Sequence, residues 1–166
     1  MPEIINNYLS PASFTISVDR MPNVEFFTQS LSIPGVSGSP VEMVTPVRSF
    51  YQPQDNLQYD DLNLSFILDE NMQSYQEILQ WMEGIGFPES TDQYSTYKAQ
   101  NQSRGLFSDI SVVITNSHKN PNIKFTFIDC FPISLGSIDL NVNTQDIAYA
   151  TCDVTFRHGQ FKIENI

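Results

Sequence analysis

Apolar and polar residues alternate along much of this chain, and a period of two is the pattern of β-strands with one buried face. The apolar positions of these segments are Phe14, Ile16 and Val18; Phe27, Leu31 and Ile33; Leu62, Leu64, Phe66 and Leu68; Ile110, Val112 and Ile114; Ile123, Phe125 and Phe127; Ile138, Leu140 and Val142; and Cys152, Val154 and Phe156. Strands with one polar face suit antiparallel sheets better than a parallel sheet that is covered on both faces. The pattern therefore predicts a mainly-β, antiparallel protein.

One segment, residues 70–83, has the period of a helix instead. Its apolar stripe consists of Met72, Tyr75, Leu79 and Met82. These residues recur at spacings of three and four, as on one face of an α-helix. Asp69 can cap the start, because its carboxylate accepts hydrogen bonds from free N–H groups of the first turn. Gly84 suits the position just past the end, and we expect the helix to lie over the sheet and close the core.

Two stretches do not have the pattern of a compact core. Residues 40–60 contain three prolines and several aromatic residues, and they predict an extended hairpin or arm. Residues 88–104 are polar without a clear period and predict a long surface loop. Residues 1–12 carry no assignable pattern. The 166 residues fit one domain, which a chain of this length can stabilise without disulfides or metals.

The charge balance excludes some classes of partner. The net charge is −11, from 19 acidic and 8 basic residues. Proteins that grip nucleic-acid phosphates or anionic membranes need clustered Lys and Arg, so neither class of binder is expected. The start of the chain has no basic and apolar leader pattern, and no apolar run approaches the ~18 residues of a membrane span. We expect a cytoplasmic protein in which Cys130 and Cys152 are reduced, small core residues.

The sequence contains no pattern of catalytic, cofactor-binding or metal-ligating residues. His118 and His158 have no metal or triad spacing, and both are predicted to be surface residues. Asp60 and Asp61 are adjacent, so on a strand their side chains would point to opposite faces and not converge on a substrate. The sequence therefore predicts a protein that is not an enzyme and has no cofactor.

The order of the predicted elements is more informative than any single motif. A first strand, SFTISVDR, and a second, FFTQSLSIPGVS, precede an arm with the pattern V-x-x-V-T-P-V-x-x-F-Y. The sequence YDDL then enters the strand NLSFIL directly before the helix, and F-x-x-C-F-P-I-S-L-G-x-I-x-L follows late in the chain. From Phe14 to Phe156 this order resembles the tail tube protein family of contractile-tailed bacteriophages, the group similar to the T4-type tube subunit.

The resemblance implies a β-sandwich or barrel-like subunit with one flanking α-helix and an extended hairpin arm. It implies sixfold rings that stack into a hollow tube, through which DNA passes without specific binding. The implied partners are further copies of the chain, tail sheath and baseplate proteins, and a tape-measure protein in the lumen. The implied location is the virion tail, assembled in the cytoplasm of a host bacterium.

Two sets of residues are expected to contribute to such an assembly. The arm is expected to contact a neighbouring subunit through Thr45, Pro46, Val47, Phe50, Tyr51 and Tyr59. Aromatic residues carry much of the energy of interfaces; the competing interpretation is a hairpin packed on its own domain. Residues expected to face the lumen are Asp139, Asn141 and Asn143. A polar, acidic lumen repels DNA and lets it slide.

Other functions remain open at this point. A baseplate tube initiator or a tail-end protein shares the subunit fold, and a contractile injection machine has a similar tube for a protein cargo. A small-ligand binding β-sandwich is the alternative from another class, with Tyr94 and Tyr97 stacking on a ligand. These functions differ in whether many copies stack, a single ring forms or the protein stays a small oligomer.

Overall fold

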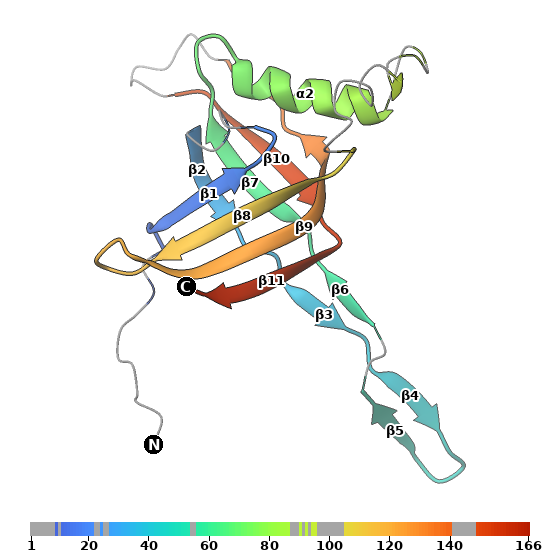
Figure 1. Ribbon diagram of the computed structural model, residues 1–166. Coiled ribbons are helices and arrows are strands. Elements are labelled where there is room, and N and C mark those ends of the chain that lie inside the picture. Colours follow the sequence, from blue (N-terminus) through green and yellow to red (C-terminus); the bar gives the residue numbers. More distant parts are fainter. Residues whose placement is uncertain are drawn as a thin grey trace.

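A computed structural model describes residues 9, 11–21, 24, 27–53, 56–86, 90, 92, 94–95, 105–140 and 149–166. Two antiparallel layers face each other, helix α2 (Gln73–Gly86) lies across one end, and a long hairpin arm projects from the other end (Figure 1). The mainly-β fold with one flanking helix and an arm, predicted from the alternation, is confirmed.

The first layer contains β1 (Phe14–Val18), β8 (Ser108–Thr115), the first part of β9 (Pro121–Leu135) and β11 (Gln160–Asn165). β8 pairs with β1 on one side and β9 on the other, and β11 pairs with the far side of β9. The second layer contains β2 (Thr28–Ser32), β7 (Leu62–Ile67), β10 (Thr151–Arg157) and the end of β9. The resulting strand order is β1-β8-β9-β10-β7-β2.

Strand β9 belongs to both layers because it changes direction near Asp129. The register with β8 shifts in this region, and Asp129 has a φ of 58°, the left-handed conformation that non-glycine residues rarely adopt. β10 and β11 follow the same bend through Gly159, whose N–H donates to the Ile128 carbonyl at 3.0 Å. Strands that switch sheets at bulges are a known way to make the corner of a sandwich.

The core fills the space between the layers and under the helix. Its fully buried apolar members are Ile16, Val18, Met21, Val24, Leu62, Leu64, Phe66, Ile78, Trp81, Ile110, Val112, Phe127, Cys130, Cys152, Val154 and Phe156. Most are the predicted apolar positions of the alternating strands. Cys130 and Cys152 are free and buried, as expected. Burial raises the pKa of Cys130 to about 12 and also raises the pKa of Cys152, so both thiols stay protonated.

The helix starts and ends three residues later than predicted. Asp69, Glu70 and Asn71 form a turn instead, closed by the Met72 N–H on the Asp69 carbonyl at 3.0 Å, and Met72 has a φ of 52°. The Asp69 carboxylate still accepts a hydrogen bond from Gln73 N at 2.9 Å, as capping required. Gly84 is buried inside the helix, which ends at Gly86 because the apolar stripe continues through Ile85.

The strand predicted over Ile138, Leu140 and Val142 is wrong in its described part. β9 ends at Leu135, and residues 136–140 form no strand. The Gly136 N–H still donates to the Asp153 carbonyl of β10, and Leu140, farther along the chain, is exposed. Asp and Asn at alternate positions of this segment disfavour strand formation. Val142 lies outside the described residues.

Candidate functional site

The arm consists of two short antiparallel ladders in series. β3 (Val36–Gly38) pairs with β6 (Leu57–Tyr59) next to the sandwich, and β4 (Val41–Val44) pairs with β5 (Ser49–Gln52) farther out. The outer ladder extends beyond the two layers (Figure 1). The extended arm predicted over residues 40–60 is therefore present, and its pairing begins four residues earlier, at Val36.

A tight turn at Thr45–Arg48 closes the tip of the arm. Thr45 N donates to the Arg48 carbonyl at 3.3 Å, and the Thr45 hydroxyl accepts from Arg48 N at 3.3 Å. Pro46 suits such a turn because its ring fixes φ near the value that the second turn position requires. The turn leaves the Val47 side chain 93% exposed.

Both faces of the outer ladder carry apolar side chains. Met43 is directly opposite Phe50, so these two side chains share a face. Val44 and Tyr51 lie on the other face, 78% and 69% exposed. Every residue of β4 and β5 is exposed. A contiguous exposed apolar surface of this kind marks an interaction site in a soluble protein.

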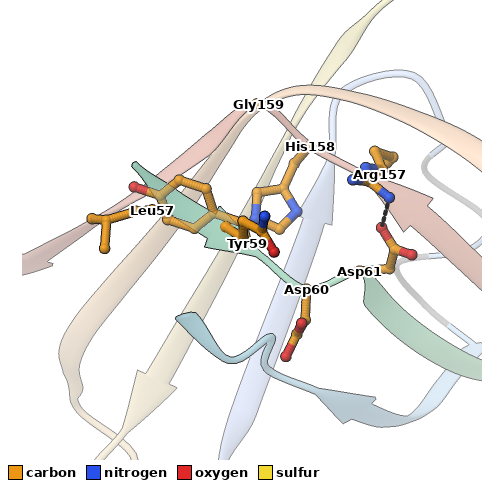
Figure 2. Close-up of a pocket in the computed structure, with 8 residues that line it drawn as sticks. Leu57, Tyr59, Asp60, Asp61, Arg157, His158 and Gly159 are labelled. Atoms are coloured by element: carbon orange, nitrogen blue, oxygen red, sulfur yellow. Dashed lines mark ion pairs between the residues drawn. The ribbon is translucent and has the colours of Figure 1, made fainter. Parts of the chain in front are cut away.

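The base of the arm is held by an aromatic cluster at the corner of the sandwich. The Tyr59 ring lies 5.8 Å from the ring of His158 and 5.5 Å from that of Phe161, measured between centroids. Figure 2 shows the His158 ring beside Tyr59, and the Asp61 carboxylate directed at Arg157, with 3.4 Å between Asp61 Oδ1 and the nearer Arg157 nitrogen. The arm is thus anchored at its base and unsupported at its tip.

His158 is a buried histidine in this cluster, 7% exposed. Phe127 contacts its ring edge-on at 5.1 Å, and neither ring nitrogen has a hydrogen-bond partner among the described residues. Burial lowers the pKa of His158; the nearby Asp61 opposes this shift and Arg157 adds to it. The side chain is therefore neutral at pH 7 and serves as a packing residue.

The described ranges contain no group of three or more His, Cys, Asp or Glu side chains that could hold a metal ion. In the same part of the chain, no helix, α2 included, is both long enough and apolar enough to cross a membrane. In these ranges, the features that could bind another molecule are the apolar arm and the unpaired edges of β1 and β2.

A family model described as "Phage tail tube protein" matches residues 1–164. The chain belongs to the phage tail tube protein family. As a member of this family it is a structural component of a phage tail, which agrees with the prediction of a non-enzymatic tail protein.

The chain is also similar to the tail tube terminator protein of Enterobacteria phage T4. It is 23% identical over 166 residues, covering 96% of this chain and 91% of the T4 protein. The terminator and the tube subunit are different parts of a tail, so this likeness leaves the finer assignment within the tail tube family to be tested.

Solved structures of contractile injection systems share the fold. The tube-terminating cap of the anti-feeding prophage has a TM-score of 0.64 at 14% identity, covering 100% of this chain and 97% of its own. A chain of the PVC sheath–tube complex in the extended state has a TM-score of 0.62 at 16% identity, covering 98% and 95%. At these identities the likeness establishes the tail tube fold alone.

The predicted interface residues of this tail tube family member lie in two places. Thr45, Pro46, Val47, Phe50 and Tyr51 gather in the outer arm. Tyr59 lies apart from them at the base, half-buried against His158 and Phe161. The predicted set therefore combines exposed residues of the outer arm with one residue at its base, and the interface role of all six stays a prediction.

The other predicted site residues are only partly described. Asp139 is exposed in the segment after β9, whereas Asn141 and Asn143 lie outside the described residues. Most of the loop 88–104 and most of residues 1–12 also lie outside them. Of the two tyrosines in that loop, Tyr94 is described as half-buried and Tyr97 is not described. The ligand-stacking role of this pair remains untested.

The prediction that His158 is a surface residue is wrong, whereas His118 is exposed as expected. The physical reason is the bend at Gly159, which carries His158 under Tyr59 and against Phe127. A signal was available in the sequence. The inward positions Cys152, Val154 and Phe156 continue in phase to residue 158, so the alternation itself points that side chain inward.

Proposed function

We propose that the protein is a ring-forming subunit of a phage tail tube. The observation that carries the proposal is the outer arm, in which every residue of β4 and β5 is exposed, the apolar side chains included. Leaving such a surface in water is unfavourable by roughly 25 cal/mol per Å² of apolar area. Contact with further copies of the chain removes this cost and makes the arm an assembly element.

The sheet edges support the same proposal. β1 and β2 are the two ends of the strand order, and each is paired on one side only within the described ranges. Unpaired strand edges promote association unless they are covered. In a ring, the edges of one subunit are covered by its neighbours, and sixfold rings of this kind stack into a hollow tube.

The acidic balance is consistent with a conduit for DNA. A net charge of −11 in 166 residues produces a negative potential that repels phosphates. The proposed partners beside further copies are sheath, baseplate and tape-measure proteins of the tail. Support for the first two comes from fold relatives described as parts of a sheath–tube complex and of a baseplate.

Electron microscopy of negatively stained, purified protein over a concentration series tests the proposal, with light scattering to measure mass. We expect rings of uniform diameter, or hollow tubes built from them. A mass that stays at one subunit across the whole series, both alone and with a purified tail baseplate added, would contradict the proposal.

A second candidate function is the terminal ring of the tube. The observation that favours it is the likeness to the T4 tail tube terminator over nearly the full length of both chains. The same microscopy separates the two functions. A repeating subunit adds to the ends of preformed tubes and lengthens them, whereas a terminator forms single rings that bind one end and stop growth.

A further inference from the structure

An apolar groove opens between the two ends of the strand order. β1 and β2 flank it, one from each layer, and they do not pair with each other. The groove is lined by Leu9, Pro11, Ser13, Phe14, Leu31, Ser32, Ile33, Val112 and Ile114. Among the described residues, the sandwich is therefore not closed between these two strands.

The groove borders the edge of the core. Val112 and Ile114 at its floor are buried side chains of β8. Leu9 and Ile33 at its rim are 60% and 39% exposed. A surface formed by core side chains with exposed apolar residues at the rim resembles the centre of an interface more than ordinary protein surface.

The charges of the groove and the arm favour a second copy of this chain as the occupant. Two copies that each carry a charge of −11 repel one another, so a stable contact must keep acidic groups out of the interface. The groove residues include no charged side chain. The outer arm, residues 41–52, carries one acidic residue and one basic residue, Glu42 and Arg48, and is neutral overall.

The shape of the arm also fits the groove. The outer ladder is a narrow hairpin with apolar side chains on both faces, and it points away from its own sandwich (Figure 1). A strand of such a hairpin can add to the free edge of β1 or β2 through backbone hydrogen bonds, while its apolar side chains enter the groove. The groove of a neighbouring copy provides both the free strand edge and the apolar surface that such an arm can bind.

We propose that the outer arm of one copy docks in the β1–β2 groove of the next copy. This rests on the proposed ring function and names the surface that receives the arm. The contact joins two different patches, so it is heterologous, and it continues from copy to copy until a ring closes or a filament forms. Every copy in a ring then both gives an arm and receives one.

Disulfide trapping between separately purified variants tests the contact. Val47→Cys places a thiol at the arm tip and Ile33→Cys places one at the groove rim. The native Cys130 and Cys152 are buried and do not compete. We expect the mixed variants to form a disulfide-linked dimer under mild oxidation.

The matched control uses Ile163→Cys in place of Ile33→Cys. Ile163 is an exposed residue of β11 and lies outside the groove. A cross-link to position 163 as strong as that to position 33 overturns the proposal.

A charge variant measures the energetic role of the groove. We expect Ile33→Glu to raise the concentration needed for assembly by about tenfold or more, and Ile163→Glu to change it by less than about threefold. Trp81 fluorescence verifies that both variants fold. If the wild type forms rings and Ile33→Glu assembles at the same concentration, the groove is not the docking site. The proposed ring function is not contradicted by that result. Wild-type protein that does not assemble, together with Val47→Cys and Ile33→Cys variants that do not cross-link, refutes both.

Discussion

At the scale of single residues, His158 shows how an ionisable side chain can serve as a core residue. It packs between Tyr59, Phe127 and Phe161 at the corner where β10 turns into β11. The groups nearest to it are an acid and a base, Asp61 and Arg157, which act on its charge in opposite directions. Burial has the largest effect on the pKa of His158 and keeps the imidazole neutral.

This burial predicts that acid destabilises the protein through His158. Its folded pKa lies below the ordinary 6.5, so the unfolded state binds the proton more readily. The free energy of unfolding is therefore at its full value above pH 6.5 and falls as the pH drops through the lowered folded pKa. Urea unfolding at pH 7.5 and pH 5 should give a smaller difference for His158→Phe than for the wild type.

The exposed His118 provides the control for that measurement. His118→Gln should leave the difference between the two pH values unchanged. An equal difference in wild type and His158→Phe would mean that other groups, and not the buried imidazole, determine the acid sensitivity.

Gly136 is a second position where one residue determines local structure. A Cβ at this position would lie 3.0 Å from the Asp153 carbonyl oxygen and 3.2 Å from its nitrogen, both backbone atoms. We expect Gly136→Ala to lower the free energy of unfolding by about 1 to 3 kcal/mol, because the neighbouring strand must shift. Gly86→Ala is the matched control, since no atom lies within 4 Å of its Cβ. Denaturant unfolding should show a change of about 1 kcal/mol or less for the control.

At the scale of elements, the strands were predictable where one face is buried over several residues. The predicted inward positions of β7, β8 and β10, and Ile16 and Val18 of β1, are buried. β11 was missed because its residues are mostly exposed and only Phe161 packs against the core. The bend of β9 at Asp129 was also missed, since a positive φ at an aspartate has no sequence signal comparable to glycine.

A substitution at the tip of the arm should impair assembly without destabilising the fold. Val47 contacts almost nothing in a single copy, so Val47→Glu should change the free energy of unfolding by less than about 0.5 kcal/mol. The same change places a charge in the proposed interface and should raise the concentration needed for rings by about tenfold or more. Denaturant unfolding and light scattering on one sample measure both effects. Unchanged assembly would remove the arm tip from the interface.

At the scale of the whole molecule, the sequence indicated a tail tube protein but could not give the geometry of its site. The order of strands and the helix is a property of the whole chain and is readable from alternation. The corner of Tyr59, Asp61, Arg157 and His158 joins residues about a hundred positions apart, and no local pattern connects them. The groove between β1 and β2 likewise depends on how the two layers are arranged in space, which no local pattern in the sequence specifies.

The charge of the molecule gives a prediction for the assembled tail. Asp139 and Asp153 are exposed acidic residues, and the acidic lumen proposed for the tube includes Asp139. Changing both to lysine would add attraction for phosphates, so DNA delivery by the phage should slow while tube length stays unchanged. Changing two exposed acidic residues on other elements, Glu83 of α2 and Glu164 of β11, to lysine provides a control with the same change of charge. Delivery at the wild-type rate in the Asp139 and Asp153 variant would exclude both residues from the lumen.

The attachment of the arm also determines how the molecule bears mechanical load. Its two legs continue into β2 and β7, which are hydrogen-bonded neighbours in the same sheet. A pull on the tip therefore runs along both strands in the same direction and is passed to β10 through the pairing of β7 with β10. Hydrogen bonds loaded in this shear geometry share the force, whereas bonds pulled from one end open singly. A load applied to the arm tip is thus spread over several hydrogen bonds of the second layer.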